Sequence, residues 1–198
     1  MKRRVLALKP TQFAVGMREV ARRVKKFRKM SGKQLAEHLR RRAVPMVVGP
    51  GRLDYIVDGH HHVRACWEAG HRDIFVDQKA DHSRLSEAEF WDVMRKSGWT
   101  HPYDQFGGGP HSPERLPENI RGVADDPYRS LAWAVRREGG YEKTSLDYAE
   151  FKWADYFREN ISMTPGEDSF KRAVKEALRL CRSGKGRRLP GFEGKRLH

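Results

Sequence analysis

Cysteine is scarce in this chain, since only Cys66 and Cys181 occur among its 198 residues. Two cysteines exclude a framework of several disulfides and a zinc site built from cysteine alone. Long apolar runs are also missing, and nothing approaches the roughly 18 successive apolar residues of a membrane-spanning helix. The apolar run after the basic start, residues 5–8, is shorter than a secretory signal requires. We therefore expect a cytoplasmic protein that has no membrane as a partner.

Acidic residues are the second shortage. Asp and Glu together number 26 against 40 Lys and Arg, which gives a formal net charge of +14 and a pI near 10.1. Such an excess is typical of proteins that bind a polyanion, and nucleic acid is the first partner to expect. The alternative is a basic protein that is merely soluble. The composition leaves the oligomeric state undetermined.

The pattern of apolar residues and turn signals predicts an α/β (α+β) fold. In the first half we expect a strand at 5–8, helices at 11–30 and 31–42, a hairpin of 44–48 with 53–57, a helix ending at Gly70 and a strand at 73–77. The second half is predicted to be mostly helical, with helices at 86–98, 126–139, 146–161 and 164–182. An irregular stretch, 99–116, separates the first of these from the second. We expect a core at 1–85, a helical extension at 86–182 and a basic flexible tail at 183–198.

The segment most informative about chemistry is Asp58-Gly59-His60-His61-His62. It follows an apolar run and opens an amphipathic segment, which predicts a strand, a tight turn and the first turn of a helix. A helix N-terminus presents unpaired N–H groups and a partial positive charge, so it attracts anions. The three histidines and Arg64 add donors and charge. We therefore expect residues 58–64 to bind a phosphate, with a histidine available for proton transfer.

Two other interpretations of this turn stay open. Consecutive residues at a helix start point about 100° apart, so three adjacent histidines cannot all bind one metal ion. Asp58 and His61 would need a distant ligand such as Asp81, His82 or His101. In the second interpretation the turn is structural, with Asp58 capping the helix.

The first predicted helix carries a further pair, Arg18 and Glu19. They are either a solvated surface pair or a phosphate clamp and a carboxylate base near the histidines. The same helix is strongly basic and is the best candidate surface for nucleic acid. Its expected contacts are Arg22, Arg23, Lys25 and Lys26.

Several segments resemble the ParB/sulfiredoxin superfamily, and within it the putative ParB-like nuclease group. They are Leu8-Lys9-Pro10-Thr11-Gln12, Val44-Pro45 and Val57-Asp58-Gly59-His60-His61-His62-x-x-Ala65, with Phe13-Ala-Val-Gly-Met-Arg-Glu-Val20 and Asp126-Pro-Tyr-Arg-Ser130 as further marks. The similarity covers about residues 5–160. It implies a small mixed-sheet domain whose glycine turn and following helix hold phosphates, followed by a mostly helical half.

The resemblance also implies chemistry. ParB proteins bind CTP at this turn, sulfiredoxins use ATP, and serine kinases of the superfamily use an N-terminal glutamate as base. The implied cofactor is Mg²⁺ with a nucleotide, either ATP, ADP or CTP. Here Gly59 matches the glycine and His61 the sulfiredoxin histidine, while His60 replaces the nucleophilic cysteine and His62 replaces an arginine. The implied catalytic residues are Glu19, His61 and His62, and the activities are nuclease (hydrolase) or phosphotransferase. The alternatives are a free-amino-acid kinase and a non-catalytic DNA-binding module.

Overall fold

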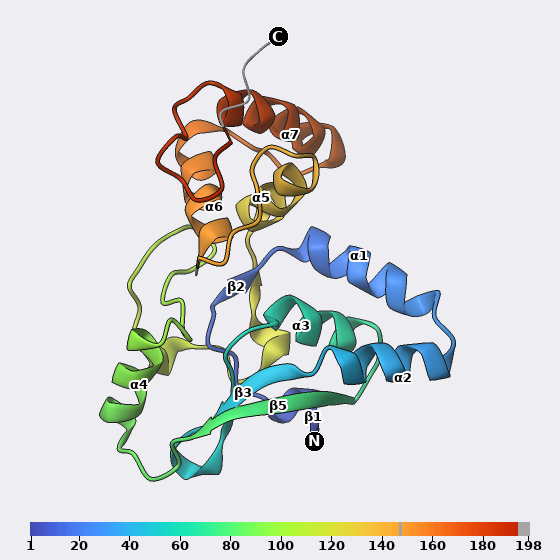
Figure 1. Ribbon diagram of the computed structural model, residues 1–198, viewed down its shortest axis with the longest axis vertical. Coiled ribbons are helices and arrows are strands. Elements are labelled where there is room, and N and C mark those ends of the chain that lie inside the picture. Colours follow the sequence, from blue (N-terminus) through green and yellow to red (C-terminus); the bar gives the residue numbers. More distant parts are fainter. Residues whose placement is uncertain (147, 194–198) are drawn as a thin grey trace. The chain divides into compact units, whose positions relative to one another are not determined.

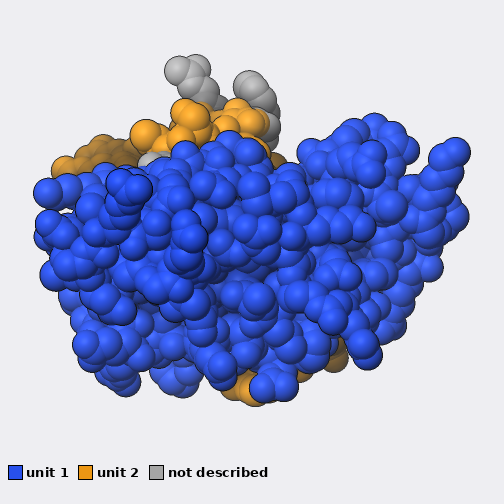
Figure 2. All heavy atoms as spheres, turned by 90° about the horizontal axis from the view of Figure 1, so that it is seen from below, with its two compact units in different colours: residues 1–125 blue, residues 126–198 orange. Residues whose placement is uncertain are grey.

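The protein is described by a computed structural model covering residues 1–146 and 148–193. It divides into two compact units, unit 1 from Met1 to Asp125 and unit 2 from Asp126 onward (Figure 2). The fold is mixed α/β, and in the described residues all strands belong to unit 1. Residues 86–125, which the sequence grouped with the helical extension, lie in unit 1.

Unit 1 is built on a four-stranded mixed sheet in the order β1-β5-β3-β4 (Figure 1). These strands are β1 (Lys2–Arg4), β3 (Val44–Val48), β4 (Asp54–Ile56) and β5 (Asp73–Asp81). The predicted hairpin is confirmed as the antiparallel pair β3–β4, and β5 runs parallel to β3. A second, two-stranded parallel sheet pairs β2 (Ala14–Val15) with β6 (Ala124–Asp125).

The helices of unit 1 cover the main sheet on both faces. Met46 of β3 belongs to the larger apolar cluster, which includes residues of α1 (Met17–Arg28), α2 (Gly32–Arg41) and α3 (His60–Glu68). The next residue, Val47, belongs to a smaller cluster with α4 (Glu87–Lys96). This alternation is what a strand buried on both faces requires.

Capping boxes fix the starts of two helices as predicted. Ser31 with Gln34 caps α2, and Ser86 with Glu89 caps α4. In each box the serine hydroxyl accepts the N3 amide and the N3 side chain accepts the serine amide.

Two predicted elements near the N-terminus are wrong. Residues 5–8 are not a strand, because Val5 and Leu8 are both buried at a spacing of three, which suits the short 3₁₀ turn Val5–Ala7. The predicted helix over 11–30 begins only at Met17. The residues before Met17 are not helical, because Ala14 and Val15 form strand β2, which pairs with β6 far along the sequence.

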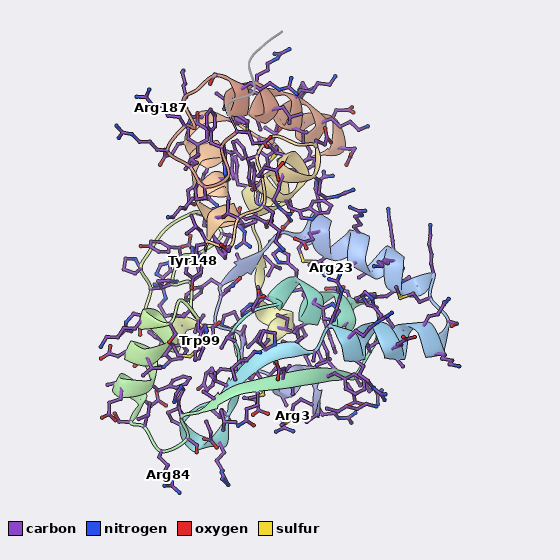
Figure 3. All side chains as sticks on the ribbon, in the orientation of Figure 1. Arg3, Arg23, Arg84, Trp99, Tyr148 and Arg187 are labelled. Atoms are coloured by element: carbon purple, nitrogen blue, oxygen red, sulfur yellow. The ribbon has the colours of Figure 1, made fainter. Side chains whose placement is uncertain are left out.

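Unit 2 consists of α5 (Pro127–Arg137), α6 (Ala149–Asn160) and α7 (Glu167–Arg182) around a cluster that includes Trp153 and Phe157. Asp126 caps α5 as expected. Tyr148, labelled in Figure 3, directly precedes α6 and has a positive φ. Of the predicted tail, residues 194–198 lie outside the described residues. Before them in the tail, the Pro190 carbonyl accepts the Trp153 indole N–H at 2.7 Å. This hydrogen bond connects the described part of the tail to α6. No helix in the described parts of the chain has the length and apolarity that a bilayer crossing demands.

Candidate functional site

The histidine turn forms as predicted. β4 ends at Ile56, and Gly59 precedes α3 with φ of 83°, a left-handed conformation that glycine adopts without strain. His60, His61 and His62 then occupy the first helical turn and point in three directions, as the 100° step between helical residues requires. Each histidine therefore meets a different part of unit 1.

His60 is part of the fold. Its side chain is buried, and Nε2 accepts the Thr11 amide at 3.0 Å. The Thr11 hydroxyl in turn donates to the Ile56 carbonyl at 2.7 Å. This network holds the extended segment before α1 against the end of β4.

His61 reaches the N-terminal end of α1. Its Nε2 accepts the Gly16 amide at 2.9 Å and lies 3.6 Å from Oε2 of Glu19. The structure thus brings together two of the predicted catalytic residues, which are 42 positions apart in the sequence. The His61 side chain is 14% exposed, so solvent reaches part of the ring.

Arg23 completes this arrangement, which we call the Glu19–His61 site (Glu19, Arg23 and His61). Its Nε and Nη2 donate to Oε1 of Glu19 at 2.9 and 2.5 Å, one helical turn along α1. Glu19 is 7% exposed, whereas the Arg23 side chain, labelled in Figure 3, is 31% exposed. Arg23 binds Oε1 of the carboxylate, while Oε2 faces His61, and its expected contact with nucleic acid stays a prediction.

His62 lies away from this site, in the apolar core. Its ring contacts Phe27 edge-on and lies beside His38 of α2. Burial, followed by the positive charges of Arg23, His38 and Arg42, lowers the pKa of His62 to about 3. Neither ring nitrogen has a hydrogen-bond partner among the described residues. The structure therefore does not bring His62 to Glu19 and His61.

Arg64 and Asp58 both make hydrogen bonds within unit 1. Arg64 Nη1 donates to the carbonyls of Ile120, Arg121 and Val123 at 3.1, 3.2 and 2.8 Å. It thereby anchors the 3₁₀ turn η4 (Ile120–Gly122) just before β6. Asp58 Oδ1 accepts the amide of the adjacent Gly59 at 2.6 Å. Gly59 is the N-cap residue of α3, and the Asp58 side chain does not cap the helix.

The basic side of α1 is exposed as expected. Arg22, Lys25 and Lys26 are all exposed, and Arg18, in the first turn, is half-buried. These residues form a cationic surface beside the Glu19–His61 site, and their contact with nucleic acid stays a prediction.

No group of three or more His, Cys, Asp or Glu side chains able to hold a metal ion occurs in the part of the chain that the structure describes. Asp58 and His61 accordingly gain no third ligand from Asp81, His82 or His101. This absence does not bear on a Mg²⁺ ion that binds together with a nucleotide, because the nucleotide phosphates then supply most of its ligands.

Two carboxylates of unit 1 were missed by sequence reasoning. Asp125 accepts the Met17 amide at 2.9 Å and so closes the start of α1, next to Gly16. Asp104 accepts the amides of Phe106 and Gly108 and lies 2.8 Å from His111 Nε2, which lowers the pKa of its carboxyl. The loop 99–116 is thus internally bonded, and beside it Phe13, Thr100 and His111 line a pocket of about 310 Å³. No pattern of neighbouring residues in the sequence predicts the hydrogen bonds of Asp125 or Asp104.

Comparisons with known proteins identify a family and a similar solved structure. No curated protein matches the chain. A crystal structure of protein Atu1540 from Agrobacterium tumefaciens matches with a TM-score of 0.89 at 36% identity, over 99% of this chain and 98% of that one. The family described as putative ParB-like nuclease matches residues 1–159, which include the whole of unit 1 and the Glu19–His61 site. With most of its length matched, the chain belongs to the putative ParB-like nuclease family.

Proposed function

We propose that this protein binds nucleic acid and hydrolyses phosphodiester bonds at the Glu19–His61 site. The observation that carries the proposal is the position of His61 Nε2. It lies between a donor, the Gly16 amide at 2.9 Å, and an acceptor, Glu19 Oε2 at 3.6 Å. A ring nitrogen in that position has a partner in both of its protonation states.

This arrangement suits a general base. Neutral His61 accepts the Gly16 N–H at Nε2. When Nε2 takes a proton from an attacking water, it stops accepting and pairs with the Glu19 carboxylate, which stabilises the imidazolium. The Gly16 N–H, at the positive end of α1, is then released to a phosphate oxygen.

In the reaction the water oxygen forms the new bond to phosphorus. The bond from phosphorus to the leaving sugar oxygen breaks, and that oxygen takes a proton from solvent. Arg23 keeps Glu19 oriented through two charge-assisted hydrogen bonds to the same oxygen, Oε1, which leaves Oε2 facing His61.

Family membership and charge support nucleic acid as the substrate. The chain carries a net charge of +14, and α1 places exposed cations beside the site. Cations of this kind bind phosphates without regard to sequence. The other expected occupant of the turn, ATP, ADP or CTP with Mg²⁺, remains an alternative ligand that isothermal titration with each nucleotide would reveal.

The test compares cleavage of plasmid DNA and of a labelled oligonucleotide by wild type, Glu19→Gln, His61→Asn and Asp92→Asn. The last is a matched control, because Asp92 pairs with Arg95 one helical turn away on α4 and its removal changes the net charge equally. Removing a general base or its partner is expected to slow cleavage roughly 100-fold or more. The Asp92 variant should stay within about twofold of wild type.

Cleavage that survives both site variants would overturn the proposal. Binding of DNA without any cleavage would favour the non-catalytic module. Phosphate transfer from ATP to a free amino acid that needs Glu19 would favour the kinase alternative.

A further inference from the structure

A basic pocket lies between the second half of α1 and α2, outside the Glu19–His61 site. Its volume is about 430 Å³. Met30 and six polar side chains line it, and these six are Lys26, Lys29, Gln34, Glu37, His38 and Arg41. We call it the α1–α2 pocket. Only Lys26 belongs to the residues expected to contact nucleic acid.

The charges around the pocket favour an anion. Lys26, Lys29 and Arg41 are exposed cations. The one carboxylate, Glu37, is 3.5 Å from Arg41, and both side chains are largely exposed. Such a pair contributes little, so a stronger anion can compete for Arg41.

The pKa of His38, which lines the pocket, is affected by the positive charges around it. Burial lowers its pKa, and the charges of Lys26, Arg42, Arg41 and Arg23 lower it further. The His38 ring is half-buried and packs against Phe27 of α1, so this side of the pocket is formed by packed side chains of both helices. Gln34 adds an amide donor, since its oxygen is occupied by the Ser31 amide at 2.9 Å.

The pocket and the Glu19–His61 site lie on one line along α1. Lys26 follows Glu19 by seven residues, close to two full helical turns, so both occupy the same face. The distance along the axis is about 10 Å at 1.5 Å per residue. Arg23 lies between them on that face, where it is partly exposed. Each strand of duplex DNA advances about 3.4 Å per nucleotide along the duplex axis, so about 10 Å corresponds to roughly three nucleotides of a duplex.

We infer that the α1–α2 pocket holds a backbone phosphate of the bound nucleic-acid strand, about three nucleotides from the bond that is cut. The distance of three nucleotides rests on the proposed function, because it is counted from the bond that is cut. The positive charge of the pocket does not depend on that function. Two lysines act on the phosphate as point charges, and Arg41 and Gln34 add directed N–H donors. Contacts of this kind fix the position of the strand and carry no base preference.

The test measures binding of a fluorescein-labelled 12-base-pair DNA duplex by fluorescence anisotropy over a range of salt concentrations, in EDTA. The pocket variant is the double substitution Lys26→Gln with Lys29→Gln. Its control is Lys171→Gln with Lys175→Gln, two exposed lysines on one face of α7 that remove the same charge. Folding of each variant is checked by circular dichroism.

The pocket variant is expected to raise Kd about tenfold and to reduce the slope of log K against log salt by about 1.8, or about 0.9 for each lost phosphate contact in a duplex. The control should change Kd less than about twofold. An equal loss in both variants would show that total charge alone matters and would overturn the inference. Binding by the pocket variant that equals wild type would overturn it too.

The register is tested with oligonucleotides that each carry one uncharged methylphosphonate linkage. In wild type, the linkage about three nucleotides from the cut should weaken binding most, and in the pocket variant that linkage should no longer matter. The two proposals fail separately. Loss of binding in the pocket variant without any cleavage by wild type would sink only the proposed function. Glu19-dependent cleavage unaffected in the pocket variant would sink only the pocket.

Discussion

The two units each bury a carboxylate at the start of a helix and hold it with an arginine, but they leave it in different states. In unit 2, Asp126 is 3% exposed and both of its oxygens are occupied. Oδ1 accepts the amides of Tyr128 and Arg129, and Oδ2 lies 2.6 Å from Arg158. In unit 1, Glu19 gives one oxygen to Arg23 and turns the other toward His61.

The difference separates a structural carboxylate from one available for chemistry. Burial raises the pKa of Asp126, and Arg158 and the two amides only partly offset this effect. Its bonds fix the start of α5 and join α5 to α6. Glu19 keeps its other oxygen, Oε2, directed at the His61 ring, 3.6 Å from Nε2. A saturated carboxylate serves the fold, whereas Glu19 has capacity left to stabilise a proton on its neighbour.

The largest effect on stability is expected at Asp126. Asp126→Ala leaves Arg158 without its buried partner and removes the cap of α5, at a cost of about 3 kcal/mol of unfolding free energy. Urea denaturation followed by circular dichroism measures it. The control is Asp155→Ala, because Asp155 also pairs with Arg158 but is 55% exposed, and its loss should cost less than about 0.5 kcal/mol. Equal losses would show that burial does not distinguish the two pairs.

The second effect concerns pH and His62. Its pKa is about 3 in the folded state and 6.5 when unfolded, so below pH 6.5 the unfolded chain binds a proton that the folded chain refuses. Stability from this residue is complete above pH 6.5 and is lost as the pH falls toward 3. Between pH 7 and 4.5 wild type should lose about 2 to 3 kcal/mol more than His62→Leu. Parallel pH curves for the two proteins would contradict a neutral, buried His62.

The smallest effect on stability is expected at Glu19. Glu19→Gln removes a buried charge, but Arg23 is 31% exposed and water can solvate it in place of the carboxylate. The loss in unfolding free energy should be about 1 kcal/mol or less, close to that of Glu37→Gln. A loss as large as that of Asp126→Ala would erase the contrast between the two units and make Glu19 a structural residue.

Local signals allowed much of the fold to be predicted. The two capping boxes, the Gly-Pro turn of the hairpin and the Asp126-Pro127 cap act within four residues of one another, so sequence alone contains them. The start of α1 was misplaced because partners far along the chain decide it. His61 and Asp125 bind the amides of Gly16 and Met17, and β6 pairs with β2.

The site was predictable in part for the same reason. Helical geometry alone shows that three adjacent histidines diverge, and the resemblance suggested that Glu19 belongs with His61. Which histidine meets which partner depends on tertiary packing, so neither the buried place of His62 nor the role of Arg64 as an anchor for η4 was foreseeable. Arg23 was taken for a surface cation because its spacing from Glu19 fits equally well on a solvated helix.

The bond between Asp125 and the Met17 amide spans 108 residues and has a consequence for synthesis of the protein. The helix that carries Glu19 leaves the ribosome early, but the carboxylate that closes its first turn follows only when unit 1 is nearly complete. At roughly 5 to 20 residues per second the interval is about 5 to 20 s. A nascent chain therefore carries the basic residues of α1 for some time before the start of this helix, and with it Glu19, is held in its final place.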